Sequence, residues 1–594
     1  MTASAPTTLV ELFERAVAAH PHRPAVSDDH GTLTYRELAD QVHALAAVLA
    51  TTGVGAGDRV ALHLPRGAPV VVSVLAILHT GAAYLPIDDV YPAARRDAML
   101  EDGAVSLVLV APGWRDRIAV PGVAILEWGS WVGADPQTGA PRPPRPRPQD
   151  AACVLFTSGT TGTPRGVVLE HRHLLAFASD PTIPVLGPGD RTAQTSSISF
   201  DTFTFELWRS VAGGAELVVL PSLPELMGAD LGREMRRQRI TAMLAPAIAL
   251  NHVVRHDREA FATLRVLCSG GDVLLPSTCA ELLAGGFAGE LLNLYGPTEA
   301  SVAVTGHVVR AVAELGDQVP IGRPFRWARV YVLDRALRPV PDGEPGQLYV
   351  SGAGVGRGYL GMPAETASRF VADPFAADGS RMYATGDVVR RGPGGAFEYL
   401  GREDKQVKIR GHRVEPREVE RFLCRSVAVA EAAVVAVGEQ DLRRLVAFVV
   451  PADEDFVLRA LREFMAGAVP AHLVPAEFVV VEAMPTDAHG KRDWAALLDL
   501  LHARTARRRA YQPPRTDTER YLVRAWEDLL AVESVGVGDD FFELGGHSLL
   551  AAHLRLLVRA DLGATVEPEA LFEHSVLAEQ ASMIDRLRTG DLVR

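Results

Sequence analysis

The chain has 594 residues, of which 48% are apolar and 22% are charged, and its 60 basic and 73 acidic side chains give a net charge of −13. This length is enough for about three to five domains and excludes a single small binding module. The composition matches that of soluble globular proteins and argues against a disordered chain. The acidic balance argues against a nucleic-acid-binding protein.

The cysteines and the N-terminal residues narrow the cellular setting. The four cysteines lie too far apart in sequence for a disulfide framework or a zinc cluster, so we expect reduced and mostly buried thiols at Cys153, Cys268, Cys279 and Cys424. Residues 1–26 lack the basic segment and apolar core of a signal peptide. The sequence contains no run of about 18 apolar residues, so no membrane span is predicted. We therefore expect a cytoplasmic protein.

Alternating helices and short apolar strands are predicted along the first part of the chain. We expect residues 11–49 to be mainly helical, interrupted by a turn and a short strand at 33–35. A strand at 59–64, a helix at 70–78 and a strand at 106–110 follow. This order is typical of parallel sheets covered by helices, which predicts an α/β fold.

A proline-rich segment at 139–148 interrupts this pattern. Prolines at this density exclude a helix interior or a central strand, so we predict an extended, solvated connection. A proline-motif ligand for a partner is the alternative. The α/β pattern resumes at 151 and continues to about 402, and a smaller unit with strands at 433–437 and 445–450 follows.

The C-terminal part is predicted to be a helical unit on a linker. Residues 503–515 are basic and then contain prolines, which indicates the linker. Helices are predicted at 518–530, 547–560 and 576–587. Residues 515–588 contain 14 acidic and 7 basic side chains. An acidic unit on a linker suggests a mobile module that docks on several partners, although charge alone favours an ordinary solvated surface.

The strongest local signal is the loop Thr157-Ser-Gly-Thr-Thr-Gly-Thr-Pro-Arg-Gly166, which follows a short apolar strand at 153–156. Its glycines let the backbone approach an anion closely, and its hydroxyls and backbone N–H groups supply donors for phosphate oxygens. It is not a Walker A loop, because the pattern GxxxxGK[ST] is absent. The segment therefore predicts a phosphate-binding loop of another class.

This loop resembles the phosphate loop of the adenylate-forming superfamily, and within it that of the adenylation domains of nonribosomal peptide synthetases. The resemblance covers residues 8–500. Its other motifs occur in the family's order: LTYREL (33–38), LHTGAAYLPID (78–88), FDTFTFELW (200–208), NLYGPTE (293–299), GQLYVSGAGVGRGYL (346–360), YATGD (383–387), GREDKQVKIRGHRVEPREVE (401–420), VPAHLVP (469–475) and HGKRDW (489–494).

A second resemblance lies near the C-terminus, where DFFELGGHSL (540–549) is similar to the attachment site of a peptidyl carrier protein. Two glycines before a polar residue and a helix leave Ser548 exposed at a helix N-terminus. The alternative is that Ser548 only caps the helix. The resemblance implies that 4′-phosphopantetheine is attached to the Ser548 hydroxyl, and that its terminal thiol is the nucleophile.

These two resemblances imply the architecture. We expect an α/β chain with a large N-terminal lobe of several sheets, a small α+β lobe and an all-α carrier bundle. The expected bounds are 1–402 for the large lobe, 403–502 for the small lobe, 503–515 for the linker and 516–594 for the carrier domain.

The implied reaction joins a carboxylate to Mg·ATP, giving an acyl-adenylate and pyrophosphate, and then transfers the acyl group to the carrier thiol. Charge builds on the phosphates, so cations and fixed donors are expected to converge there. The family usually has lysine where this chain has Arg165, which keeps the charge with another geometry. The implied ATP site comprises Thr157, Ser158, Gly159, Thr160, Thr161, Gly162, Arg165, Gly270, Asn293, Tyr295, Gly296, Thr298, Asp387 and Arg402.

The resemblance also implies individual roles. Glu299 matches the family's magnesium ligand, a hard carboxylate for a hard cation. Tyr295 matches the ring that lies against adenine, Thr298 a phosphate contact, and Asp387 the carboxylate that binds the ribose hydroxyls. Arg402 resembles a second nucleotide contact.

Two further matches concern catalysis and motion. Lys491 matches the catalytic lysine, which bridges the substrate carboxylate and the α-phosphate. Asp404 matches the hinge between the lobes. The family rotates its small lobe between adenylation and thiolation, which is expected to bring residues 408–411 near the carrier arm.

The substrate is expected to be an α-amino or imino acid, because Asp201 matches the aspartate that pairs with the substrate's ammonium group. The remaining pocket positions are mainly apolar, so a medium-sized apolar side chain fits best. Aryl-glycines, cyclic imino acids and branched aliphatic acids stay open. These positions are Thr202, Phe205, Leu244, Leu267, Ser269, Leu294, Val302 and Ala303.

No condensation motif and no GxSxG thioesterase motif occurs, so we expect a stand-alone loading didomain. The implied partners are a phosphopantetheinyl transferase and a downstream acceptor enzyme, and the need for an MbtH-like helper protein stays open. No nucleic acid or membrane partner is expected. Two alternatives are a ligase for a non-amino carboxylic acid and a carrier scaffold that a partner enzyme loads.

Overall fold

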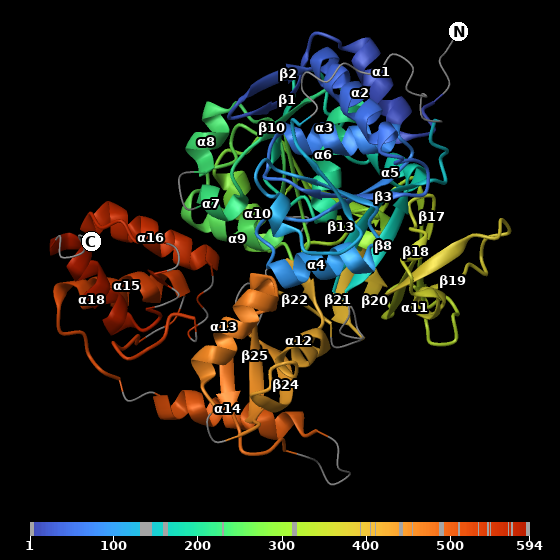
Figure 1. The fold of residues 1–594 in the computed structure, drawn as a ribbon. Helices are drawn as coiled ribbons and strands as arrows, with labels where there is room; N and C mark the ends of the chain where they lie inside the picture. Colours follow the sequence, from blue (N-terminus) through green and yellow to red (C-terminus); the bar gives the residue numbers. More distant parts are fainter. Residues whose placement is uncertain are drawn as a thin grey trace.

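The computed structural model describes residues 5–130, 145–158, 164–227, 231–311, 316, 318–392, 394–403, 406–409, 411–438, 443–453, 456–485, 492–508, 511–530, 532, 534–542, 544, 546, 548–567, 570–571 and 574–589. A large rounded lobe, a smaller lobe beneath it and a helical unit at its side are visible in Figure 1. Residues 139–144 of the predicted proline-rich connection (139–148) lie outside the described residues.

The first large sheet has seven strands within the described residues. Its centre is parallel, and β7 and β8 pair antiparallel to one another. Its order is β18 (Gly358–Tyr359), β8 (Arg165–Glu170), β7 (Ala151–Thr157), β4 (Ala83–Pro86), β3 (Arg59–His63), β5 (Leu107–Val110) and β6 (Ala124–Glu127).

The second large sheet has nine strands in the part of the chain that the structure describes. Its middle strands, from β13 to β1, run parallel to one another. Its order is β15 (Arg323–Pro324), β14 (Thr305–Val309), β13 (Glu290–Tyr295), β12 (Val266–Gly270), β11 (Ala242–Pro246), β9 (Arg191–Gln194), β10 (Glu216–Val219), β1 (Pro24–Asp28) and β2 (Gly31–Thr34).

Helices lie between and around these sheets. The helices are α1 (Leu9–Ala19), α2 (Tyr35–Thr51), α3 (Ala68–His79), α4 (Ala93–Asp102), α5 (His171–Ala178), α6 (Asp201–Gly213), α7 (Leu223–Met227), α8 (Leu231–Arg237), α9 (Ala247–His256), α10 (Pro276–Ala284) and α11 (Pro363–Arg369), with 3-10 turns at Arg115–Arg117 and Thr298–Ala300. Helix α3 is buried along Val70–Leu78, as expected of a helix that is apolar all round. One hydrophobic cluster joins residues of α3 and α6 to residues of both sheets.

A third, antiparallel sheet completes the large lobe. Its strands are β16 (Ala328–Leu333), β17 (Gly346–Gly352), β20 (Arg381–Arg391), β19 (Phe370–Ala372) and β21 (Phe397–Arg402). Strand β21 pairs with β20 and places Arg402 opposite Asp387. The chain leaves the large lobe at this point.

The small lobe combines a hairpin, a three-stranded sheet and helices, and lies below α4 in Figure 1. Its elements are β22 (Val407–Ile409), β23 (His412–Val414), α12 (Pro416–Leu423), β24 (Val429–Val437), β25 (Arg444–Pro451), α13 (Leu458–Ala468), a 3-10 turn (Ala471–Leu473), β26 (Glu477–Val480) and α14 (Trp494–Arg508). Arg95 of α4 pairs with Glu418 of α12 at 3.5 Å, and both side chains are buried. This ion pair joins the lobes.

The C-terminal unit is helical and lies beside α7 and α9 of the large lobe (Figure 1). Its helices are α15 (Asp517–Leu530), α16 (Ser548–Leu562) and α18 (Leu577–Thr589). Its core contains Trp526, which meets Phe541 edge-on at 5.1 Å between ring centroids. The predicted architecture of an α/β lobe, an α+β lobe and a helical carrier unit is confirmed.

Two local details differ from the prediction. Residues 11–49 are mainly helical, as predicted, but a further strand, β1, precedes β2, and this antiparallel pair separates α1 from α2. The N-cap Thr34 and Glu37 form a capping box that starts α2 at Tyr35, which ends the predicted strand there. The predicted linker 503–515 is helical as far as Arg508, since alanine and arginine favour helix and Pro513 lies further on.

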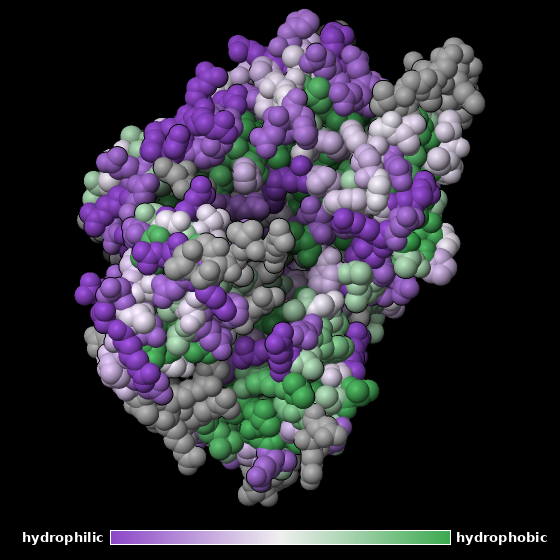
Figure 2. All heavy atoms as spheres, turned by 60° about the vertical axis from the view of Figure 1, so that its left-hand side comes forward, coloured by the Kyte–Doolittle hydropathy of each residue, from purple (hydrophilic) through white to green (hydrophobic). Residues whose placement is uncertain are grey.

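The outer surface is mainly hydrophilic, with hydrophobic residues gathered low in the view of Figure 2, at the level of the small lobe. No helix among the described residues is both long and apolar enough to cross a bilayer.

We expect Trp526→Ala to destabilise the carrier unit by about 3–5 kcal/mol, because it leaves a large cavity in a small core. The loss of stability is measured during thermal unfolding, with hydrogen exchange of the amides of α15 and α18 as the probe. Tyr521→Phe is the matched control, since it removes only a 2.7 Å hydrogen bond to Asp561 on the surface and should cost less than about 1 kcal/mol. Equal loss in both variants would contradict the prediction.

Candidate active site

Three of the predicted nucleotide residues meet where β13 and β21 end, beside the middle of β20. The Tyr295 hydroxyl donates to the Asp387 carboxylate, and Arg402 Nη1 donates to Asp387 Oδ1 at 2.5 Å. Arg402 Nη2 also donates to the Thr385 carbonyl oxygen at 2.9 Å. Burial, together with the charge of Asp387, raises the pKa of Tyr295 well above its usual value. The phenol is therefore neutral and acts as a donor.

Glu299 lies on the 3-10 turn that follows β13 and is fully buried. The Tyr359 hydroxyl donates to its Oε1 at 2.7 Å, and Arg413 Nη1 lies 3.1 and 3.0 Å from its two oxygens. Burial opposes ionisation, but the Arg413 charge and the Tyr359 bond hold the pKa of Glu299 below its usual value. An ionised carboxylate is thus kept in the interior by a cation of the small lobe.

The backbone after Glu299 is strained. Ser301 and Val302 have φ of 57° and 76°, a region that a β-branched residue rarely adopts. Two such residues cost on the order of 1–3 kcal/mol each. A side chain at Gly296 would place Cβ only 2.5 Å from Ala303 Cα. The turn is therefore folded tightly against 302–303, which places these predicted pocket residues beside Glu299.

Asp201 begins α6, and its carboxylate accepts a hydrogen bond from the Thr298 hydroxyl. Burial and the nearby Glu299 charge raise the pKa of Asp201 to about 6, against the lowering effects of Thr298 and Lys408. The structure thus brings Asp201, Thr298 and Glu299 together from α6 and the 3-10 turn. Thr202 follows Asp201 and is partly exposed.

Most of the predicted pocket residues share one hydrophobic cluster, which contains Phe205, Leu244, Leu294, Val302 and Ala303. Leu267 does not join them. It packs in a different cluster, because side chains alternate across β12 and it points away from the face of its neighbour Cys268. The assignment of Leu267 to the substrate pocket therefore stays a prediction.

Three other predicted residues, Ser269, Gly270 and Asn293, lie on β12 and β13. Ser269 is buried, and its hydroxyl has no hydrogen-bond partner among the described atoms. Asn293 Nδ2 donates to the Pro320 carbonyl oxygen at 2.8 Å. A Cβ at Gly270 would lie 2.6 Å from the Leu294 carbonyl oxygen, so only glycine fits there. The Ser269 hydroxyl is therefore a polar group among mainly apolar neighbours.

The predicted phosphate loop is described only at its ends. Gly159, Thr160, Thr161 and Gly162 lie outside the described residues, and Thr157 is the last residue of β7. The Ser158 hydroxyl donates to the Arg413 carbonyl oxygen at 2.5 Å. Arg165 is buried in β8, pairs with Glu365 at 3.0 Å and lies 5.2 Å from the Tyr359 ring centroid. The arginine that replaces the usual lysine is thus already neutralised by a carboxylate.

The small-lobe hairpin β22–β23 covers the nucleotide residues. Lys408 Nζ lies 6.0 Å from the ring centroids of both Tyr295 and Tyr399. Arg413 and Tyr359 were not predicted from the sequence as site residues, although both stand within the motifs quoted above. The signal that could have pointed to Arg413 is its position as a cation two residues after Gly411. The predicted Lys491 and the predicted hinge Asp404 lie outside the described residues.

Ser548 is the first residue of α16, as predicted, although its side chain is not described. The loop before it is held by Asp540, whose carboxylate accepts from the Ser575 hydroxyl and from the Phe542 N–H at 2.9 Å. Helix α16 lies against α7 of the large lobe. The end of the chain that bears Ser548 is therefore docked on the lobe that contains Glu299.

Family models match three segments of the chain: residues 13–360 match the AMP-binding enzyme model, residues 418–491 the AMP-binding enzyme C-terminal domain, and residues 520–584 the phosphopantetheine attachment site. The chain belongs to the AMP-binding enzyme family. It is an adenylate-forming enzyme with a carrier domain, and it uses ATP, Mg²⁺ and 4′-phosphopantetheine.

Relatives of this AMP-binding enzyme are peptide synthetases. It is 39% identical to the probable non-canonical nonribosomal peptide synthetase CymA of Salinispora arenicola, over 99% of this chain and 7% of that protein. It is 36% identical to tyrocidine synthase 3 of Brevibacillus parabrevis, over 97% of this chain and 9% of that protein. The chain therefore spans less than a tenth of the length of these two relatives.

Solved structures show the same arrangement of domains. Holo-PA1221, described as a nonribosomal peptide synthetase protein with adenylation and carrier domains bound to a vinylsulfonamide inhibitor, matches with a TM-score of 0.82 and 27% identity, over 99% of this chain and 98% of that chain. The fused di-domain NpsA–ThdA from Klebsiella oxytoca has the same fold, with a TM-score of 0.74 and 24% identity, over 98% and 99% of the two chains.

We expect Arg413→Ala to loosen the small lobe. Removing one partner of a buried ion pair costs about 3–5 kcal/mol, and swinging the hairpin away lets water reach Glu299. Small-angle scattering should show a larger radius of gyration, and the amides of β22–β23 should exchange faster. Arg390→Ala is the control, because its pair with Glu398 at 2.6 Å lies within one sheet. A scattering curve identical to wild type would contradict this prediction.

Proposed function

We propose that this enzyme activates an α-amino or imino acid with a medium-sized apolar side chain as its aminoacyl-adenylate. The acyl group then moves to the phosphopantetheine thiol on Ser548, with loss of AMP. The observation that carries the substrate class is Asp201, a carboxylate held beside Glu299 by Thr298 and next to an apolar cluster. A buried carboxylate favours a cationic partner, which an amino acid supplies and a fatty or aryl acid does not.

The roles of the described residues follow from their contacts. Asp387, with its oxygens oriented by Tyr295 and Arg402, would accept from the ribose hydroxyls. Glu299 fits a magnesium ligand, since it is ionised and already holds a positive charge in its buried site. Mg²⁺ bound there would neutralise charge on the phosphates. Lys491 is proposed to bridge the substrate carboxylate and the α-phosphate.

The position of the hairpin β22–β23 supports the proposal that the two lobes are arranged here as for thiolation and not as for adenylation. Arg413 pairs with Glu299, Lys408 faces Tyr295, and the carrier domain is docked on α7. For adenylation we propose that the small lobe turns about Asp404, which separates Arg413 from Glu299 and brings Lys491 to the substrate. The proposed bounds of the moving parts are those expected from the sequence, 403–502 and 516–594.

Loading of Ser548 tests the proposal directly. The protein is converted to its holo form with a phosphopantetheinyl transferase and coenzyme A, and then mixed with Mg·ATP and one amino acid per tube, with and without an MbtH-like protein. The peptide that contains Ser548 is weighed by mass spectrometry. We expect a mass gain for one apolar amino or imino acid. Ser548→Ala should carry no arm, and Lys491→Ala should carry the arm but no acyl group.

Three results would contradict the proposal. A gain with a non-amino carboxylic acid would favour the ligase alternative. A Lys491→Ala variant that loads at the wild-type rate would favour a carrier loaded by another enzyme. A holo mass that stays constant across the panel, in both arms of the experiment, would mean that the substrate class is wrong.

Substrate binding should weaken in acid because of Asp201. Its pKa of about 6 means that the carboxyl becomes neutral below this value and no longer attracts an ammonium group. Since a bound cation favours the ionised form, the amino-acid dissociation constant should rise by up to about tenfold per unit as pH falls from 7 to 5. In Asp201→Asn, calorimetry should show weak binding with no pH dependence. An equal slope in both proteins would contradict this assignment.

A further inference from the structure

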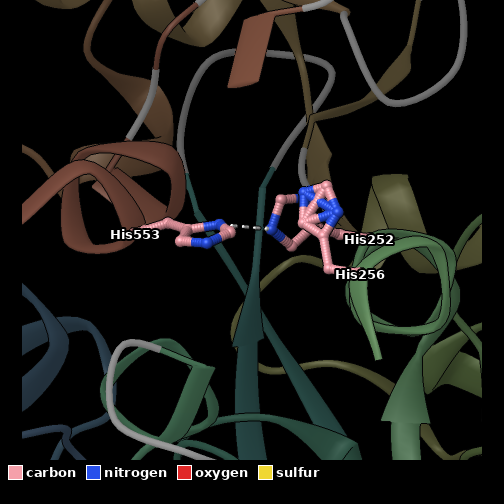
Figure 3. Close-up of side chains that lie close together, drawn as sticks. All are labelled: His252, His256 and His553. Carbon is pink, nitrogen blue, oxygen red and sulfur yellow. Dashed lines mark hydrogen bonds between the residues drawn. The ribbon is translucent and has the colours of Figure 1, made fainter. Parts of the chain in front are cut away.

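Three histidines meet where the carrier domain contacts the large lobe. His252 and His256 lie one turn apart on α9, and His553 comes from α16 of the carrier domain (Figure 3). Residues three or four apart share one face of a helix, so both α9 imidazoles face the same neighbour. Among the described residues, this is the one group of metal-ligating side chains that converges, and no role described above uses it.

The geometry of the group is compact. One nitrogen of each imidazole lies within 4.8 Å of a nitrogen of the other two. His252 Nε2 lies 3.3 Å from His553 Nδ1, and Figure 3 draws this contact. The ring centroids of His256 and His553 are 5.1 Å apart. Three imidazoles from two domains thus surround one point.

We propose that His252, His256 and His553 bind a divalent transition-metal ion of the zinc class, which ties the carrier domain to the large lobe. Three imidazoles with a water as fourth ligand are a common tetrahedral set for Zn²⁺. Zn–N bonds of about 2.0–2.1 Å require nitrogens about 3.3 Å apart. The 3.3 Å contact between His252 and His553 already meets this, and small side-chain rotations bring the third nitrogen in.

The protonation state of the group supports binding. Burial lowers the pKa of His252 to about 3 and that of His553 to about 4, and it also lowers the pKa of His256. Each ring is therefore neutral at physiological pH and has a lone pair available for a metal. The charge of Arg255, which also lowers the pKa of His252 and His256, acts against a bound cation.

The consequence concerns the residue that carries the arm. His553 stands five residues after Ser548 on α16, which is about 7.5 Å along the helix axis. A metal at His553 would fix the helix that begins with Ser548 in its docked position. The carrier domain must leave this position to reach an acceptor, so metal binding would slow its release. This last step rests on the proposed role of Ser548, whereas metal binding itself does not.

Metal binding is tested with untagged, chelator-treated protein, because polyhistidine tags bind zinc. Zn²⁺ is partitioned between the protein and a chromophoric chelator, and the affinity is read from the chelator's absorbance. We expect one site per chain in wild type and in the control His574→Ala, a carrier histidine outside the group. His256→Ala and His553→Ala should each weaken binding at least about tenfold. His553→Gln, which keeps a polar side chain, should weaken it equally.

The clamp is tested on the same proteins by hydrogen exchange with and without Zn²⁺. The amides of α9 and α16 should exchange more slowly with Zn²⁺ in wild type and in His574→Ala, but not in His553→Ala. No zinc bound by wild type, or equal binding in all variants, would overturn the site. Zinc lost in His256→Ala but kept in His553→Ala, or bound without slower exchange, would overturn the link between the domains. None of these readouts requires an active enzyme.

Discussion

The arrangement of this enzyme depends on one buried ion pair, between Glu299 of the large lobe and Arg413 of the small lobe. Glu299 is fully enclosed, so its charge is tolerable only beside a cation and a donor, which Arg413 and Tyr359 supply. The pair holds the β22–β23 hairpin over Tyr295 and aligns the small lobe. A second cation at Glu299 would share its charge with Arg413, so metal binding there and closure of this hairpin act against one another.

The same principle organises the other carboxylates of the site. Asp387 is flanked by Tyr295 and Arg402, whereas Asp201 accepts from the Thr298 hydroxyl. Asp387 therefore has a cation in direct contact. Asp201 forms no ion pair with a residue that the structure describes, and its pKa is raised. A cationic group gains most by binding at the uncompensated position, which supports the proposed assignment of Asp201 to the substrate.

The sequence predicted the fold class and the residues that meet around β13, because each motif is local and its side chains lie within a few residues of a strand end. It could not predict contacts that tertiary packing decides. Arg413 reaches Glu299 across 114 residues, and His553 reaches His252 across 301. Leu267 packs in a different cluster from most of the other predicted pocket residues, because a motif offset gives a position along β12 but not the face to which the side chain points. Strand β1 was missed because it is only five residues long.

The contacts between the lobes suit the rotation of the small lobe that we propose. Two of the ion pairs that join the lobes, Arg413–Glu299 and Arg95–Glu418, are largely buried, whereas a third, Arg335–Glu403, is exposed. Such pairs contribute little net stability, since the desolvation of two charges offsets their attraction, yet breaking one partner alone is costly. For these two pairs, complete separation, with all four charges returning to water, therefore has a small net electrostatic cost, whereas a half-open state that leaves one charge buried is penalised. This favours two discrete arrangements over a continuum, as the proposed alternation between adenylation and thiolation would require.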